Sequence, residues 1–224
     1  MFQVNGKISK TIDIQDRSVQ YGDGVFETIA VYDKKPEFWI DHFKRLKKGC
    51  KILKIKCPSE KFLKKEIKKF FTKLKLKKFI LKIIISRGKG GRGYKLPEIM
   101  KPVRILGMYK WPNYPKKNIL EGVNLNICKT KLSQQPILSG IKHLNKLEQI
   151  IARSEWTNKF ISESIMLDNK NNVVEGTMSN IFGVKNNNFI VPEIKFAGIH
   201  GIMRKIIINI LKRKKEKYLI KEIN

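Results

Sequence analysis

The stretch Gly140-Ile141-Lys142-His143-Leu144-Asn145-Lys146-Leu147-Glu148 is the part of the sequence that decides the fold. Apolar residues in and after it recur at the spacing of one helical face: Leu144, Leu147, Ile150 and Ile151. This spacing predicts a helix that begins a few residues after Lys142. A lysine before such a face could be partly desolvated, which lowers the pKa of its amine as a Schiff-base lysine requires. Alone, Lys142 could equally be a solvated surface charge, because lysine is abundant in this chain.

Composition predicts a folded chain with an unusual charge. The 224 residues are 42% hydrophobic, and 48 basic against 19 acidic residues give a formal net charge of +29. That charge raises nucleic acid as a partner. However, eight of the 48 basic residues are arginine, the residue favoured for base and phosphate contacts. Lysine, isoleucine and asparagine share A/T-rich codons, so we attribute the charge to a biased genome and expect no specific nucleic acid.

The cysteines and the termini favour a reducing setting. Cys50, Cys57 and Cys128 are scattered and odd in number, which implies neither a disulfide framework nor a zinc site. The chain begins without a basic-then-apolar leader, and its apolar run Phe79–Ile85 is short and interrupted by Lys82. We therefore expect a cytoplasmic protein with no membrane partner and no metal.

The first half of the chain alternates short strands with two amphipathic helices. Strands are expected at Val25–Tyr32, through Phe38 and Trp39, at Phe79–Ser86 and at Val103–Tyr109. One helix is expected from about Asp41, with Phe43, Leu46, Cys50 and Leu53 on one face. A second is expected from the cap residue Ser59, with an apolar stripe of Leu63, Ile67, Phe70, Phe71 and Leu74. The glycine-rich loop, Gly88 to Gly93, separates the last two strands.

The second half is richer in strands. Pro112 and Pro115 mark a linker, so we expect a small domain at 1–111, a linker at 112–118 and a larger β-rich domain at 119–224. The expected strands are Val123–Lys129, Ser164–Leu167, Val173–Gly176, Asn180–Val184 and Phe189–Val191. A last helix opens at Gly201, with Ile206, Ile207, Ile210 and Leu211 inside, before a mostly charged tail. The pattern predicts an α+β fold.

Two basic or amide-rich features are suited to phosphate. Arg45 could be a surface charge on its helix, or a clamp whose guanidinium binds two phosphate oxygens. Gly201-Ile202-Met203 could simply enter a helix, or its free backbone N–H groups could seat a phosphate. The sequence leaves both alternatives open.

Glu175 and the glycine-rich loop are further candidates. Glu175 ends an apolar strand and could be a solvated carboxylate, or the partner of a protonated pyridine nitrogen. The segment Ser86–Tyr94 lacks the helix-linked pattern of a nucleotide loop. With Arg87, Arg92 and Tyr94 it could form a mobile lid that binds a substrate with carboxylates.

Taken together, these segments resemble the fold-type IV pyridoxal-phosphate enzymes, the class IV aminotransferase family. The segments that carry the resemblance are Asp16-Arg17, Tyr21 to Thr28, His42 to Arg45, Arg87 to Tyr94, Gly140 to Glu148, Glu175 with Asn180 to Phe182, and Gly201 to Arg204. It covers Met1 to about Leu211 and implies a fold like that of D-amino acid aminotransferases. The family continues for several dozen residues beyond that helix, so we expect a second domain that is shortened at its C-terminus.

The resemblance also implies roles. Lys142 would bind pyridoxal 5'-phosphate covalently, Arg45 and the amides of Ile202 and Met203 would hold its phosphate, and Glu175 would pair with its ring nitrogen. Substrate contacts would come from Thr28, Arg92 and Tyr94. The loop and lysine motifs favour the family's lyases, which convert 4-amino-4-deoxychorismate to 4-aminobenzoate and pyruvate, and a homodimer is implied.

Three alternatives stay open at this point. A branched-chain or D-amino acid aminotransferase of the same fold would transfer an amino group to 2-oxo acids. A basic nucleic-acid-binding protein would bind DNA or RNA in a salt-dependent way. An inactive remnant would fold without taking up the cofactor.

Overall fold

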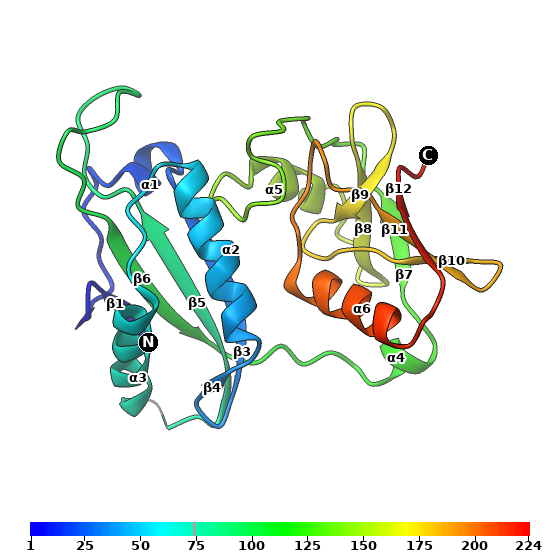
Figure 1. The fold of residues 1–224 in the computed structure, drawn as a ribbon, viewed down its shortest axis with the longest axis horizontal. Coiled ribbons are helices and arrows are strands. Elements are labelled where there is room, and N and C mark those ends of the chain that lie inside the picture. The colour runs from blue at the N-terminus through cyan, green and yellow to red at the C-terminus, as the bar shows by residue number, and fades with distance from the viewer. Residues whose placement is uncertain (74) are drawn as a thin grey trace. The chain divides into compact units, whose positions relative to one another are not determined.

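The computed structural model describes residues 1–73 and 75–224, and the chain divides into two compact units (Figure 1). The first unit holds Met1–Asn113 together with Ile141–Asn145. The second holds Tyr114–Gly140 together with Lys146–Asn224. Residues 141–145, which the sequence analysis assigned to the second domain, therefore cluster with the first unit.

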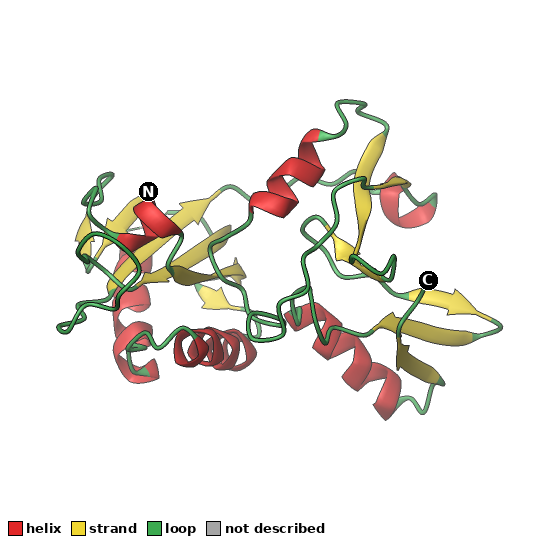
Figure 2. Ribbon diagram, turned by 90° about the horizontal axis from the view of Figure 1, so that it is seen from above, coloured by secondary structure: helices red, strands yellow, loops and turns green. Residues whose placement is uncertain are grey.

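The first unit is built on a six-stranded antiparallel sheet with the order β2-β1-β6-β5-β3-β4. Its strands are β1 (Phe2–Val4), β2 (Lys7–Ile8), β3 (Gly24–Tyr32), β4 (Lys35–Pro36), β5 (Lys78–Ser86) and β6 (Val103–Tyr109). Its helices are α1 (Arg17–Tyr21), α2 (Trp39–Ile52) and α3 (Glu60–Thr72). Figures 1 and 2 show α2 and α3 on the same face of this sheet.

Alternation and capping explain how these elements form. Side chains alternate across a strand, and every second residue of β3 and β5 is buried under the two helices. Helix α3 begins after Ser59, whose hydroxyl accepts a hydrogen bond from the amide of Phe62 at 3.2 Å. The shared core includes Val25, Ile29, Leu46, Leu63, Phe70, Phe79, Leu81, Ile83 and Ile85.

The second unit contains two three-stranded sheets, ordered β7-β8-β9 and β10-β11-β12. The strands are β7 (Asn124–Ile127), β8 (Ile161–Leu167), β9 (Val173–Gly176), β10 (Gly183–Lys185), β11 (Asn188–Pro192) and β12 (Tyr218–Lys221). The helices are α4 (Lys117–Leu120), α5 (Leu147–Ser154) and α6 (Ile202–Arg213). A small core gathers Cys128, Leu132, Ala152, Trp156, Met166, Val174 and Ala197. The predicted α+β class is confirmed.

Several local predictions were wrong. The strand expected through Phe38 and Trp39 is absent, because Phe38 adopts a left-handed conformation as the N-cap of α2. The charged tail contains β12, which gains a ladder of hydrogen bonds by pairing parallel with β11. In α6 the side chain of Ile208 is buried and that of Ile210 is exposed. Leu74, expected in the apolar stripe of α3, lies outside the described residues.

The apolar face predicted for α5 is not covered within this chain. Leu147, Ile150 and Ile151 are 70%, 61% and 55% exposed. Helical spacing showed that these residues share a face, but it could not show whether that face is buried.

None of the helices described, over 1–73 and 75–224, has the length and apolar character needed to cross a bilayer.

Candidate active site

Backbone hydrogen bonds hold the Lys142 segment along β3 in the first unit. The amide of Phe26 donates to the Lys142 carbonyl at 2.9 Å. Two residues further on, the amide of Leu144 donates to the Gly24 carbonyl, also at 2.9 Å. Gly24 permits this approach, because a Cβ there would come within 2.7 Å of the Leu144 side chain and of the Ile85 carbonyl oxygen. The position from which the Lys142 side chain extends is therefore fixed by β3.

The Lys142 side chain lies on a face of β3 that carries a second cation. Its Nζ is 4.5 Å from the centroid of the Phe26 ring, and Nζ of Lys82 is 5.2 Å from the same centroid. Thr28 lies opposite Lys82 in the β3–β5 pairing and shares the Phe26 face by strand alternation. Two ammonium groups near one ring, with Thr28 on the same face of the strand, are suited to an anionic ligand.

Lys82 was not predicted as a site residue. Its sequence signal was a charge inside the apolar run Phe79–Ile85. From sequence alone, that charge argues only against a membrane span. Its position beside Phe26 depends on the register between β3 and β5, which the sequence does not show.

A buried carboxylate orients Arg45. The Arg45 Nε donates to Oε1 of Glu27 at 2.8 Å, and its Nη2 donates to Oε2 at 2.6 Å. Nδ1 of His42 lies 2.6 Å from the same Oε2. Burial raises the pKa of the Glu27 carboxyl, but the hydrogen bonds from Arg45 and His42 outweigh burial and hold it below its ordinary value. Arg45 is thus a fixed guanidinium rather than a loose surface charge.

The glycine-rich loop is tied to α1. The Gly93 carbonyl accepts a hydrogen bond from Nη1 of Arg17 at 2.9 Å, and the Gly93 amide donates to the Tyr21 hydroxyl at 3.1 Å. Arg92 and Tyr94, on either side of Gly93, are exposed, and the rings of Tyr21 and Tyr94 meet edge to face at 5.5 Å. The loop's predicted mobility and its substrate contacts stay predictions.

A charge cluster anchors the start of this loop. The carboxylate of Asp23 accepts from Nε of Arg17 at 2.9 Å, and from Nε and Nη2 of Arg87 at 2.6 and 3.0 Å. Burial raises the pKa of Asp23, but the two guanidinium groups outweigh it and keep that pKa below its usual range. Since Arg87 directly precedes the glycine-rich loop, the cluster fixes where the loop leaves β5.

Glu175 of the second unit is a buried acid with amide donors. It is 3% exposed, and its Oε2 accepts from the amide of Ile199 at 2.9 Å and from Nδ2 of Asn180 at 3.3 Å. The same Nδ2 donates to the Ile199 carbonyl at 3.0 Å. The solvated strand-end carboxylate, one of the two alternatives for Glu175, does not fit this burial.

The turn that follows Glu175 is built around a second carboxylate. Glu163 accepts from the amide and hydroxyl of Thr177 at 3.1 and 2.6 Å, from the Met178 amide at 3.3 Å and from the Ser179 hydroxyl at 3.0 Å. These bonds fix the backbone between Glu175 and Asn180.

Lys146 is a second amine that sequence reasoning did not select. Burial lowers the pKa of its ammonium group, and the carboxylates of Glu175 and Glu148 act in the opposite direction. It lies in the quoted stretch, but its neighbour Glu175 is far away in the sequence. That neighbour could not be identified from local pattern.

Helix α6 begins with uncapped amides. Its N-cap Gly201 forms no side-chain hydrogen bond, and Ile202 and Met203 are the first helical residues. Such amides carry partial positive charge and bind anions readily. Arg204 is buried and donates from Nη2 to the Pro192 carbonyl at 3.0 Å. This end of α6 is electropositive.

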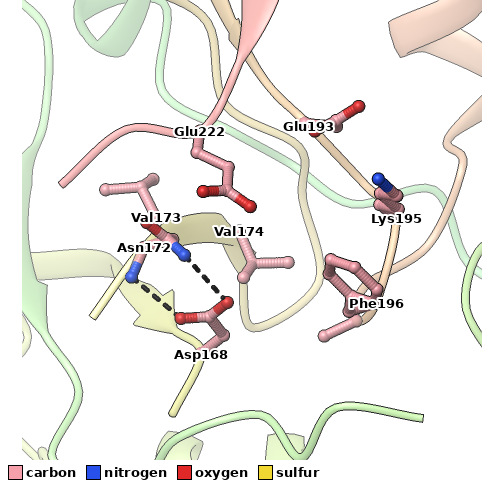
Figure 3. Close-up of a pocket in the computed structure, with 9 residues that line it drawn as sticks. Asp168, Asn172, Val173, Val174, Glu193, Lys195, Phe196 and Glu222 are labelled. Carbon is pink, nitrogen blue, oxygen red and sulfur yellow. Dashed lines mark hydrogen bonds between the residues drawn. The ribbon is translucent and has the colours of Figure 1, made fainter. Parts of the chain in front are cut away.

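A small hollow in the second unit lies elsewhere (Figure 3). Asp168, Asn172 and Glu222 contribute to its walls. Its Asp168 carboxylate accepts from the amide and from Nδ2 of Asn172 at 2.9 and 3.2 Å. None of the candidate site residues is among the described residues that line this hollow.

Comparisons with known proteins place the chain in a family. Residues 24–224 match the family described as Amino-transferase class IV. Aminodeoxychorismate lyase of Vibrio harveyi is 34% identical over 211 residues, which cover 94% of this chain and 77% of the relative. A putative branched-chain-amino-acid aminotransferase of Methanocaldococcus jannaschii is 27% identical over 216 residues, or 93% of this chain and 74% of the relative.

Solved structures agree with this placement. The 4-amino-4-deoxychorismate lyase of Pseudomonas aeruginosa superposes with a TM-score of 0.95 at 35% identity, covering all of this chain and 82% of that one. A branched-chain aminotransferase from Escherichia coli superposes with a TM-score of 0.90 at 22% identity, covering all of this chain and 77% of that one, which shows the shared fold alone. The fold-type IV architecture predicted from the motifs is confirmed, and the chain belongs to the class IV aminotransferase family.

Proposed function

We propose that this chain is a pyridoxal-phosphate-dependent lyase that converts 4-amino-4-deoxychorismate to 4-aminobenzoate and pyruvate. The observation that carries the proposal is the similarity of this chain to two proteins named as aminodeoxychorismate lyases, at 34% and 35% identity over almost the whole chain. The relatives named as aminotransferases stand at 24% to 27%. The placement of Lys142 beside β3 is consistent with this activity.

The donor set fits pyridoxal phosphate, the cofactor of this family. Arg45 and the uncapped amides of Ile202 and Met203 suit the phosphate. Glu175 is a buried carboxylate that suits a protonated ring nitrogen, and Lys142 supplies the amine for the covalent link. When bound, this cofactor supplies an electron-accepting ring.

The chain's own residues would then position the substrate and move its protons. Lys142 would remove the proton from the substrate carbon that bears the amine, and would return to release the product. Glu175 would hold a proton on the cofactor ring nitrogen. Thr28, Arg92 and Tyr94 would orient the substrate carboxylates, as the resemblance implies.

An absorbance spectrum of the purified protein with pyridoxal phosphate is the direct test, followed by addition of aminodeoxychorismate. We expect a visible absorbance band, then release of 4-aminobenzoate and pyruvate in equal amounts. Lys142→Ala should remove the band and the activity, whereas the exposed Lys68→Ala on α3 should change neither. A folded wild-type protein that shows no band would sink the proposal and favour the inactive remnant.

The aminotransferase alternative makes a different prediction for the same sample. Family relatives named D-alanine and branched-chain aminotransferases are similar to the chain over 88% or more of its length. Amino transfer from D-alanine or a branched-chain amino acid to a 2-oxo acid, without formation of 4-aminobenzoate, would favour that alternative over the lyase.

We further propose a homodimer in a cytoplasmic setting, without specific nucleic acid. The support for the dimer is the exposed apolar face of α5, formed by Leu147, Ile150 and Ile151, because isolated proteins rarely leave such faces in water. Light scattering after size exclusion should give twice the chain mass of 26.1 kDa. Ile150→Glu should reduce that mass.

A further inference from the structure

Glu27 breaks the burial pattern of β3. The residues around it on the helix-covered face of this strand are Val25, Ile29 and Val31, each at most 1% exposed, and Glu27 is equally buried at 1%. Burying a carboxylate costs free energy unless the charge is paired and hydrogen-bonded. Sites where a chain departs from such a local rule are often functional.

The partners of Glu27 come from one helix. His42 and Arg45 are three residues apart on α2, so both face β3 from adjacent turns. Arg45 uses Nε and Nη2 for two parallel hydrogen bonds to Glu27, and His42 contacts the oxygen that accepts from Nη2. The carboxylate therefore fixes the plane and the direction of the guanidinium.

The fork geometry fixes how Arg45 is presented. A guanidinium has five N–H donors in one plane, and two of them, on Nε and Nη2, are bonded to Glu27. The plane of the guanidinium is then set by Glu27 rather than by a free rotation of the side chain. A guanidinium held in this way loses less conformational freedom when it binds an anion.

We propose that Glu27 and His42 are positioning residues that set the Arg45 guanidinium for the phosphate of the cofactor. The inference rests on the proposed function, because it takes Arg45 as a phosphate ligand. Glu27 also carries negative charge, which by itself weakens the attraction of Arg45 for a phosphate. The fixed orientation of Arg45 outweighs this loss of attraction.

Two cofactor forms without an aldehyde separate the phosphate contact from the rest of binding. Pyridoxamine phosphate and pyridoxamine differ only in the phosphate, and neither can form an imine with the chain's many lysines. Calorimetric titration gives the ratio of their two affinities. We call the ratio of the affinity for pyridoxamine phosphate to that for pyridoxamine the phosphate advantage. In Glu27→Ala we expect this ratio to fall about tenfold, which is the effect of losing about one hydrogen bond.

A second buried pair provides the matched control. Arg104 of β6 donates from Nε to Glu66 of α3 at 2.8 Å, and from Nη2 at 3.3 Å. Glu66→Ala also removes a carboxylate from a guanidinium in the first unit, so it should lower stability comparably. It should leave the phosphate advantage unchanged, because Arg104 is not a proposed ligand.

A double-mutant cycle tests whether Glu27 acts through Arg45. The effect of Glu27→Ala should disappear in an Arg45→Ala background. His42→Asn can keep an N–H donor near the position of the His42 Nδ1 atom, so it should retain most of the phosphate advantage. His42→Ala has no such donor and should reduce it. This series also covers the case in which Glu27→Ala fails to fold.

The outcomes distinguish this inference from the proposed function. An unchanged or larger phosphate advantage in folded Glu27→Ala would overturn the positioning role and leave the lyase proposal intact. Wild-type protein that does not prefer pyridoxamine phosphate over pyridoxamine would instead remove the phosphate site, and the proposed function with it.

Discussion

Single side chains near Phe26 define the chemistry of the first unit. Lys142 and Lys82 lie 4.5 and 5.2 Å from that ring, and Thr28 shares its face. A ligand with two carboxylates would be attracted by both cations on this surface, whereas a neutral ligand would gain no such attraction. The face is thus matched to a dianionic substrate such as the one proposed.

Lys82→Met should weaken substrate binding without removing the cofactor. Methionine keeps an unbranched apolar stem that is one atom shorter, so the main loss is one cation beside the substrate carboxylates. We expect the KM for aminodeoxychorismate to rise about tenfold or more, which corresponds to one charge-assisted contact. The visible cofactor band should persist. A KM equal to that of the wild type would exclude Lys82 from substrate binding.

The cysteines should differ in reactivity. A hydrogen bond from Cys50 is the main cause that lowers the pKa of Cys57, with a further contribution from the charge of Lys47. The same thiol contact and burial raise the pKa of Cys50, and burial raises that of Cys128. Thiolates are the reactive form, so iodoacetamide at pH 7 should label Cys57 first. Peptide mass mapping that finds Cys50 or Cys128 labelled before Cys57 would contradict this order.

Whole elements depend on contacts that join distant segments. The glycine-rich loop is attached to α1 by Arg17 and Tyr21, and Asp23 joins Arg17 to Arg87. Because Arg92 and Tyr94 belong to this loop, its attachment determines where they are presented. Helix α1 is therefore a support for the loop rather than a separate feature.

Arg17→Met should release the loop while leaving the cofactor site. It removes the bonds to Gly93 and Asp23 but keeps an unbranched side chain beside Gly90. We expect KM to rise and the glycine-rich loop to become more sensitive to trypsin at Arg92, with the absorbance band retained. Arg104→Met, which breaks a different ion pair of this unit, should not change trypsin cleavage at Arg92. Equal cleavage rates in wild type and Arg17→Met would contradict the support role.

For the whole molecule, charge sets the response to acid. The chain carries a net charge of +29, so each further proton adds repulsion. The pKa values of Asp23, Glu27 and Glu163 are held below their ordinary values, because hydrogen-bond donors outweigh the effect of burial. A group with a lowered folded pKa stabilises the protein above its unfolded pKa, and this contribution is lost as pH falls through the folded value.

Stability should accordingly hold from pH 7 to about pH 5 and fall below about pH 4, near the ordinary carboxyl pKa. Thermal unfolding followed by circular dichroism at each pH measures this. Glu163→Gln should flatten part of the acid-induced loss, since it removes one of the carboxyls. A thermal unfolding midpoint, Tm, that is the same at pH 3 as at pH 7 would show that these carboxylates contribute nothing to stability.

Local pattern predicted much of the fold and named most of the candidate residues. The helical stripe of α3, the alternation of β3 and the segment around Lys142 are written in neighbouring residues, because helices and strands repeat over a few positions. The same holds for the family resemblance, which rests on short motifs. Those motifs named Arg45, Lys142, Glu175 and Gly201 to Arg204, whose roles stay predictions.

The tertiary structure decided which of these residues have partners and which faces are buried. The bond from Arg17 to Gly93 spans 76 positions, and the approach of Lys82 to Phe26 depends on the register between two strands. The exposed face of α5 and the added strand β12 also depend on packing across the unit. Glu27 is the clearest case: the sequence shows an acid in an apolar strand, but only the position of α2 over β3 brings His42 and Arg45 to it. Such pairings are set by the free energy of packing distant segments together, and no local pattern encodes that.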